Sequence, residues 1–133
     1  LGVTASGACT AAIAAGVAAG VTSWAVDCPR ELGKLAECLD QGAEIAVRFH
    51  LGVPGAAYDF GEKFGASPEA AGDLLRAVAA RGFTPAMTFH PGTQCTEPAA
   101  WAAYIARART VPLRNTGSAI SPLNAPALVP PCQ

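Results

Sequence analysis

Apolar residues in the first 109 positions repeat with two alternating periods, one typical of strands and one typical of helices. Short apolar runs predict three buried strands, at residues 22–26, 44–49 and 85–89. Apolar side chains at helical spacing predict four helices, at residues 11–19, 29–41, 68–81 and 96–108. Strands that alternate with amphipathic helices in this way indicate βαβ units and a parallel sheet.

Two of the expected helices have apolar faces that we expect to pack on the sheet. The face of the second helix consists of Leu32, Leu35, Ala36 and Leu39. The face of the fourth helix consists of Trp101, Tyr104, Ile105 and Ala108. The third helix has a strong start signal, because its hydroxyl residue is followed by a proline and an acidic residue, in the order Ser67, Pro68 and Glu69.

The alternation favours an α/β fold in which each strand is followed by a helix of similar length. That pattern is typical of a (β/α)8 TIM-type barrel or of a doubly wound sheet. About three βα units cannot close a barrel, so we expect an incomplete barrel over residues 1–109. Residues 110–133 have neither period and hold five of the chain's 11 prolines, so we expect a disordered Pro-rich tail.

Charge and cysteine content exclude several classes of function. The net charge of −1 and the pI near 6.1 give no electrostatic basis for binding nucleic acid or an anionic membrane. The uncharged first 26 residues are mainly Ala, Gly, Thr and Ser, which are too weakly apolar for a membrane span. The 5 cysteines are odd in number and form no CxxC pair, so we expect reduced thiols, no metal site and a cytoplasmic protein.

Polar residues at the ends of the expected strands are the candidates for chemistry, because functional groups of parallel α/β units gather there. Asp27 follows the first strand, where a helix-capping side chain is the simplest interpretation. Arg48 lies in the second strand, and a buried charge there must be paired or bind an anion. His90 follows the third strand, and the Gly92 and Thr93 after it offer backbone NH groups and a hydroxyl suited to a phosphate.

Four segments of the chain, in consistent order over residues 11–108, carry a family resemblance. Phe89 to Pro98 is similar to an FHVGS segment, and Glu62 to Gly65 is similar to a KFG loop. Val47 to Phe49 resembles an LRI strand, and Ala18 to Asp27 resembles an AAGV turn with the strand after it. These segments resemble the fold-type III decarboxylases, which use pyridoxal 5'-phosphate (PLP) and act on ornithine, lysine, arginine or diaminopimelate. The Gly-Thr-Gln ending of the first motif is closest to bacterial ornithine or lysine decarboxylases.

The resemblance implies roles for individual residues. His90 would stack on the pyridine ring of PLP, Thr93 would bind the phosphate in place of a serine, and Arg48 would help to position the cofactor. Lys63 would lie at the contact between the two subunits of a homodimer. The parent enzyme would convert ornithine or lysine to a diamine, in polyamine biosynthesis.

The chain departs from the family pattern in ways that bear on activity. Pro91 stands where the family supplies a backbone NH group, and residues 110–133 lack its glycine-rich phosphate loop. A PLP decarboxylase also needs a lysine for a Schiff base with the cofactor, and Lys34 and Lys63 match other positions. We therefore assign no catalytic residue and expect a fragment that is inactive alone. A degenerate, non-catalytic homologue that binds at most a partner is the alternative, whereas the combination of motifs argues against an amino-acid racemase.

Overall fold

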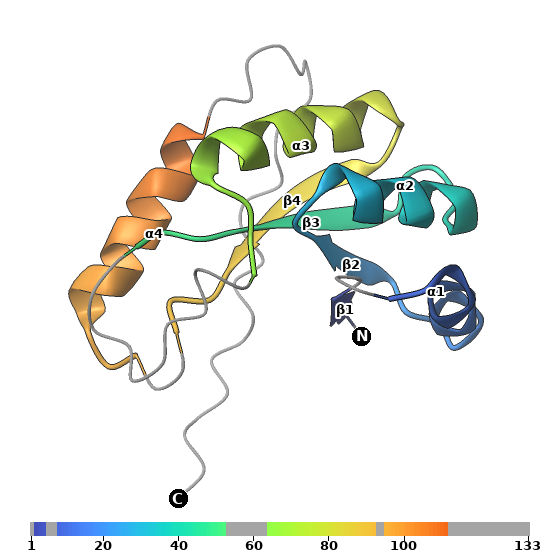
Figure 1. Ribbon diagram of the computed structural model, residues 1–133, viewed down its shortest axis with the longest axis horizontal. Helices are drawn as coiled ribbons and strands as arrows, with labels where there is room; N and C mark the ends of the chain where they lie inside the picture. Colours follow the sequence, from blue (N-terminus) through green and yellow to red (C-terminus); the bar gives the residue numbers. More distant parts are fainter. Residues whose placement is uncertain (1, 5–7, 53–63, 93–94, 112–133) are drawn as a thin grey trace, which may run out of the picture.

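The computed structural model describes residues 2–4, 8–52, 64–92 and 95–111. These residues form strands and helices in strict alternation, as Figure 1 shows. The elements in chain order are β1 (Gly2–Thr4), α1 (Thr10–Ala18), β2 (Ser23–Val26), α2 (Pro29–Cys38), β3 (Glu44–Phe49), α3 (Pro68–Ala80), β4 (Thr84–Phe89) and α4 (Pro98–Thr110).

The strands form one parallel sheet in the order β1-β2-β3-β4, so strands that are neighbours in the sequence are also neighbours in space. Right-handed crossovers between successive parallel strands bring the connecting helices to the same side of the sheet. In Figure 1, α3 lies across β3 and β4, and it contacts both strands. The arrangement confirms the expected α/β fold and is an open part of a (β/α) barrel.

In the part of the chain that the structure describes, helices cover one face of the sheet and leave the other face open. Every second residue of β2 and β3 is buried against the helices, and these side chains are Trp24, Val26, Ile45, Val47 and Phe49. The intervening residues point to the other face and are small or polar. One row across that face, set by the strand register, consists of Ala25, Ala46 and Ala86.

The third helix begins and ends where its local chemistry predicts. The Ser67 side chain accepts a hydrogen bond from the backbone NH of Ala70 at 3.2 Å, and Pro68 occupies the first helical position. At the other end Gly82 has a φ of 81°, a left-handed conformation that suits glycine after a helix. The apolar face of α3 is buried through Leu74, Leu75 and Val78.

Two elements differ from the sequence-based expectation. The pattern did not predict β1, a strand of 3 residues that is too short to show a period. The second helix was expected to continue to residue 41, but it ends at Cys38, and Leu39 is already extended with a ψ of 143°. The chain then turns through residues 40–43 to enter β3. Of the expected apolar face, Leu32 and Leu35 are buried, whereas Ala36 is exposed.

The buried face of α4 also differs from the expected one. Tyr104 is buried, but Trp101 and Ile105 are 43% and 46% exposed. The Tyr104 hydroxyl donates to the carbonyl oxygen of Leu51 at 3.0 Å and accepts from its NH at 2.8 Å. Reaching Leu51 turns the Tyr104 side of the helix inward, and this rotation moves the other two large side chains outward.

The described residues bear on the expectations for a membrane span, the cysteines, a metal site and the tail. No helix among them is long and apolar enough to cross a membrane. Four cysteines are free thiols, and the described part of the chain holds no cluster that could bind a metal ion. The expected disordered tail lies outside the described residues beyond Val111, which is itself buried against the core.

Candidate cofactor site at the strand ends

The sheet brings the three polar strand-end residues to one edge. Asp27 directly follows β2, Arg48 is the penultimate residue of β3, and His90 directly follows β4. Because the strands are parallel, their carboxyl ends meet at the same edge of the sheet. Arg48 pairs in register with Thr88 on the open face, two residues before His90.

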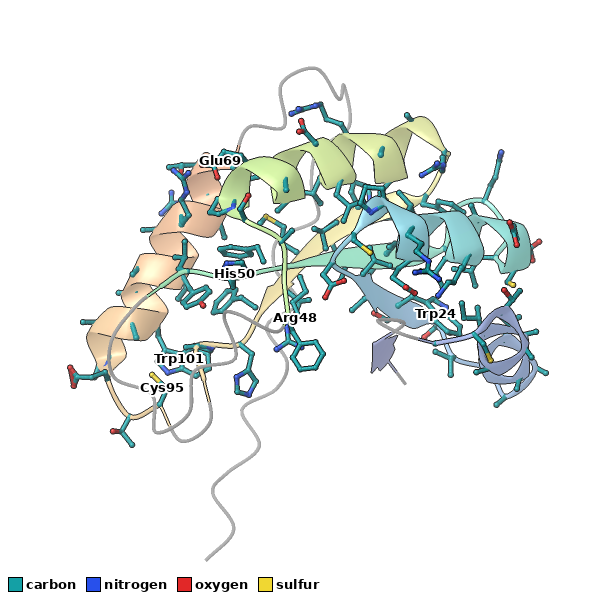
Figure 2. All side chains as sticks on the ribbon, viewed as in Figure 1. Trp24, Arg48, His50, Glu69, Cys95 and Trp101 are labelled. Carbon is teal, nitrogen blue, oxygen red and sulfur yellow. The ribbon has the colours of Figure 1, made fainter. Side chains whose placement is uncertain are left out.

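The Arg48 side chain lies against an aromatic ring. Its guanidinium carbon is 5.5 Å from the centre of the Phe64 ring, within the range of a cation–π contact. Figure 2 labels Arg48 among the side chains of the described residues. No carboxylate of the described residues lies within ion-pair distance of the guanidinium. Of the two expected alternatives for Arg48, a charged partner or a bound anion, the described residues supply no carboxylate partner.

The loop after β4 fixes the orientation of the His90 ring. The backbone NH of Gly92 donates to His90 Nδ1 at 3.0 Å. Gly92 has a φ of 121°, which favours glycine, and both Pro91 and Gly92 are buried while the histidine side chain is exposed. An exposed, flat ring held by its own loop is suited to stacking on an aromatic ligand. Thr93, the expected phosphate-binding residue, lies outside the described residues.

The Phe64–Ala66 segment lies beside the end of β3. Ala66 forms a parallel bridge with Phe49, and its backbone NH donates to the Arg48 carbonyl oxygen at 2.8 Å. The NH of Gly65 donates to Asp27 Oδ2 at 3.2 Å, and the Gly65 carbonyl is 2.8 Å from His50 Nδ1. The segment is thus held by the ends of two strands.

These contacts change the interpretation of two residues. Asp27 was expected to cap the helix after it, but the N-cap residue of α2 is Cys28, which makes no side-chain cap bond. Asp27 instead binds Gly65, a contact from 38 residues away that no local pattern predicts. His50 directly follows β3 and received no role from the sequence, but its ring also binds Gly65. Lys63, expected at a subunit contact, lies outside the described residues.

An aromatic cluster supports this edge of the sheet from the helix side. The Phe89 ring stacks on Tyr104 with centroids 4.9 Å apart, and Phe49 contacts both rings at 5.7 and 5.4 Å. Trp101 adds an edge contact to Phe89 at 6.1 Å. The last residues of β3 and β4 are therefore packed firmly, which fixes the backbone that carries Arg48 and His90.

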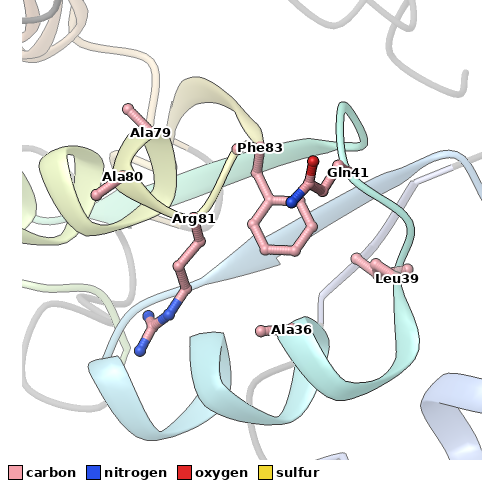
Figure 3. Close-up of a pocket in the computed structure, with 8 residues that line it drawn as sticks. Ala36, Leu39, Gln41, Ala79, Ala80, Arg81 and Phe83 are labelled. Atoms are coloured by element: carbon pink, nitrogen blue, oxygen red, sulfur yellow. The ribbon is translucent and has the colours of Figure 1, made fainter.

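A shallow hollow between α2 and α3 lies at the opposite end of the strands. Its walls come from residues 36–41 and 79–83, which precede β3 and β4 (Figure 3). In parallel βα units functional groups gather at the carboxyl ends of strands instead. The hollow is therefore separate from the candidate site.

The donor groups at the carboxyl edge fit a cofactor that combines an aromatic ring with a phosphate. An exposed imidazole can stack on the ring, and the Arg48 guanidinium, which has no carboxylate partner among the described residues, can attract the anion. The fold defines a partial (β/α) barrel domain, with Arg48 and His90 at the carboxyl ends of its strands.

Comparison with known proteins identifies the family. Residues 4–123 match the family described as "Pyridoxal-dependent decarboxylase, pyridoxal binding domain". The chain therefore belongs to the PLP-dependent decarboxylases, through their cofactor-binding domain. No curated protein matches the chain.

Solved structures agree with this assignment. A mutant of SrLDC in complex with PLP is 33% identical over 73% of this chain and 25% of its own, with a TM-score of 0.67. Lysine decarboxylase from Selenomonas ruminantium is 33% identical over 73% of this chain and 26% of its own, with a TM-score of 0.63. The arginine decarboxylase of Paramecium bursaria Chlorella virus is 22% identical over 77% of this chain and 28% of its own; its TM-score of 0.71 supports the fold alone. The chain thus spans about a quarter of the length of these enzymes.

Proposed function

We propose that this chain is the part of a basic amino-acid decarboxylase that holds PLP, through His90, Thr93 and Arg48. The observation that carries the proposal is the meeting of an oriented, exposed imidazole and a guanidinium at one strand edge, in a chain of this family. Bound PLP would supply an electron sink for the electron pair left when the substrate carboxylate departs as CO2.

Each residue has a distinct task in this proposal. His90 would stack its ring on the pyridine ring, held in orientation by Gly92. Arg48 would provide positive charge next to the anionic cofactor, since the Phe64 ring stabilises the guanidinium without neutralising it. The Thr93 hydroxyl would donate a hydrogen bond to a phosphate oxygen.

We further propose that the chain alone does not decarboxylate amino acids. Lys34 lies on α2, where its ammonium group binds both Glu31 oxygens, at 3.0 and 3.2 Å, and the Ala8 carbonyl oxygen at 3.0 Å. These contacts tie α2 to the segment before α1 and leave the ammonium unsuited to covalent attachment of a cofactor. The alternative is a non-catalytic homologue, and the same lysine contacts favour it equally.

The proposal also covers the substrate, the assembly and the cellular location of the parent enzyme. We propose lysine or ornithine as the substrate of the parent enzyme, with a diamine product used in polyamine synthesis. Lysine decarboxylases are among the structures that are 33% identical to this chain, which supports a basic amino acid. A cytoplasmic homodimer with Lys63 near the subunit contact completes the proposal.

Titration of the purified chain with PLP, followed by absorbance or fluorescence, tests the cofactor assignment. We expect saturable binding that weakens about tenfold in Arg48→Met, because a charge-assisted contact to the cofactor anion is lost. His90→Ala should weaken it by about fivefold through loss of stacking. Arg76→Met is the matched control, since Arg76 pairs with Asp73 on the surface of α3. Equal effects of all three substitutions would contradict the assignment.

The same preparation tests the proposal on activity. We expect no CO2 release from lysine, ornithine, arginine or diaminopimelate, and no lysine labelled after borohydride reduction with PLP. Turnover by the purified chain, or a reduced pyridoxyl group on Lys34, would refute this part of the proposal while leaving the cofactor site intact.

A further inference from the structure

Both backbone polar groups of Gly65 are bound by side chains from strand ends. The NH donates to Asp27 Oδ2 at 3.2 Å, and the carbonyl oxygen lies 2.8 Å from His50 Nδ1. Asp27 follows β2 and His50 follows β3, so the two side chains anchor the segment across neighbouring strands. Neither residue has a part in the ring or phosphate contacts proposed above.

Only glycine fits at the anchored position. Gly65 has a φ of 100°, and a Cβ atom built there would lie 3.1 Å from the Phe49 carbonyl carbon and 3.2 Å from the His50 nitrogen. The Gly65 backbone therefore lies directly against the last peptide of β3. This close approach allows the two side chains to reach the Gly65 NH and carbonyl.

We propose that Asp27 and His50 are positioning residues: by clamping Gly65 they hold the Phe64 ring over the Arg48 guanidinium. Phe64 precedes Gly65 directly, so fixing the glycine fixes the point from which the aromatic side chain projects. The clamp thereby orients the cation that, in the proposed function on which this inference rests, faces the PLP anion.

The clamp requires a particular tautomer of His50. A carbonyl oxygen only accepts hydrogen bonds, so Nδ1 of His50 must carry a proton to bind Gly65. His90 Nδ1 accepts from the Gly92 NH, so the proton of its neutral ring resides on Nε2. The chain has only 2 histidines, and the clamp predicts opposite tautomers for them.

Substitutions at His50 separate positioning from simple packing. The amide NH2 of Asn lies close to where Nδ1 of histidine lies, so His50→Asn retains the donor to Gly65, whereas His50→Ala removes it. We expect the PLP dissociation constant to rise about fivefold or more in the alanine variant and to stay within about twofold in the asparagine variant. Asp27→Asn and Asp27→Ala form the parallel pair, since the Asn oxygen still accepts from the Gly65 NH.

Long-range proton–nitrogen NMR spectra, recorded with both histidine rings in the neutral form, test the clamp without PLP. We expect the Nδ1–H form for His50 and the Nε2–H form for His90, assigned with the single-histidine variants. An Nε2–H form at His50 would overturn the proposal. So would equal loss of PLP binding in the asparagine and alanine variants, or an alanine variant that is less stable but binds PLP normally. If the wild-type chain binds no PLP, the proposed function fails, and the tautomer spectra still decide on the clamp.

Discussion

At the scale of single residues, Gly65 is a position where the backbone leaves little room for a side chain. Its φ of 100° lies in the region that disfavours a side chain, and an added Cβ would meet the end of β3 at 3.1 Å. The adjacent contacts to Asp27 and His50 depend on that close approach. The identity of this residue therefore affects both stability and the candidate site.

Gly65→Ala should destabilise the chain by at least about 1–2 kcal/mol, the cost of an L-residue in left-handed conformation. Gly33→Ala is the control, because Gly33 lies inside α2 with nothing within 4 Å of an added Cβ. That change should stabilise by about 0.5–1 kcal/mol, as expected for Gly to Ala in a helix. Urea denaturation followed by circular dichroism measures the free energy of unfolding of both variants. A Gly65→Ala variant as stable as the wild type would disprove the close packing of Gly65 against the end of β3.

Sequence reasoning identified some of the residues at the carboxyl ends of the strands and missed others for a physical reason. Arg48 and His90 could be found because parallel strands place their carboxyl ends together, a rule that needs only the strand positions. The roles of Asp27 and His50 could not, since both depend on Gly65, 38 and 15 residues away along the chain. Tertiary hydrogen bonds of this kind leave no local period.

At the scale of elements, the helix starts differ in how well they are capped. Ser67 caps α3 through its hydroxyl, whereas Cys28 occupies the same position at α2 and makes no side-chain cap bond. Both residues have extended backbone conformations that suit an N-cap. Removing the cap of α3 should therefore lower the free energy of unfolding, and adding a cap to α2 should raise it.

Ser67→Ala should cost about 1 kcal/mol of unfolding free energy, and Cys28→Ser should gain about 0.5–1 kcal/mol, because serine accepts from a free NH of the first turn and alanine cannot. Urea midpoints of the two variants and of the double variant measure these effects. If Cys28→Ser destabilises the chain, the thiol contributes packing that outweighs the missing cap.

Sequence reasoning predicted the positions of helices and strands better than it predicted which face of a helix is buried. Strand β3 and the caps of α3 were expected where they are found, because alternation and the Ser-Pro-Glu signal are local. The orientation of α4 was wrong by about one position on the helix. The Tyr104–Leu51 hydrogen bonds decide that orientation, and they join residues 53 apart.

At the scale of the molecule, the sheet that the described residues form is open at both edges. Within the described residues β1 and β4 each have one neighbouring strand, and one face of the sheet lacks a covering layer. Unpaired strand edges promote association with other chains, and an open sheet buries less apolar surface than a closed barrel.

We therefore expect low stability and a broad unfolding transition for the isolated chain. Trp24 is 2% exposed in the core and Trp101 is 43% exposed on α4, so their fluorescence reports on different parts of the molecule. Single-tryptophan variants made with phenylalanine should show different midpoints in urea. A single cooperative transition of the monomer at high temperature would contradict this expectation.

The most direct test of the account is to map where PLP binds on the chain. Two-dimensional proton–nitrogen NMR spectra, recorded during a titration with PLP, follow each backbone amide. The account predicts the largest shifts at the carboxyl ends of β3 and β4, around Arg48, His90 and Gly92, and unchanged signals around the hollow formed by residues 36–41 and 79–83. Shifts confined to that hollow, or no saturable shift at all, would contradict it.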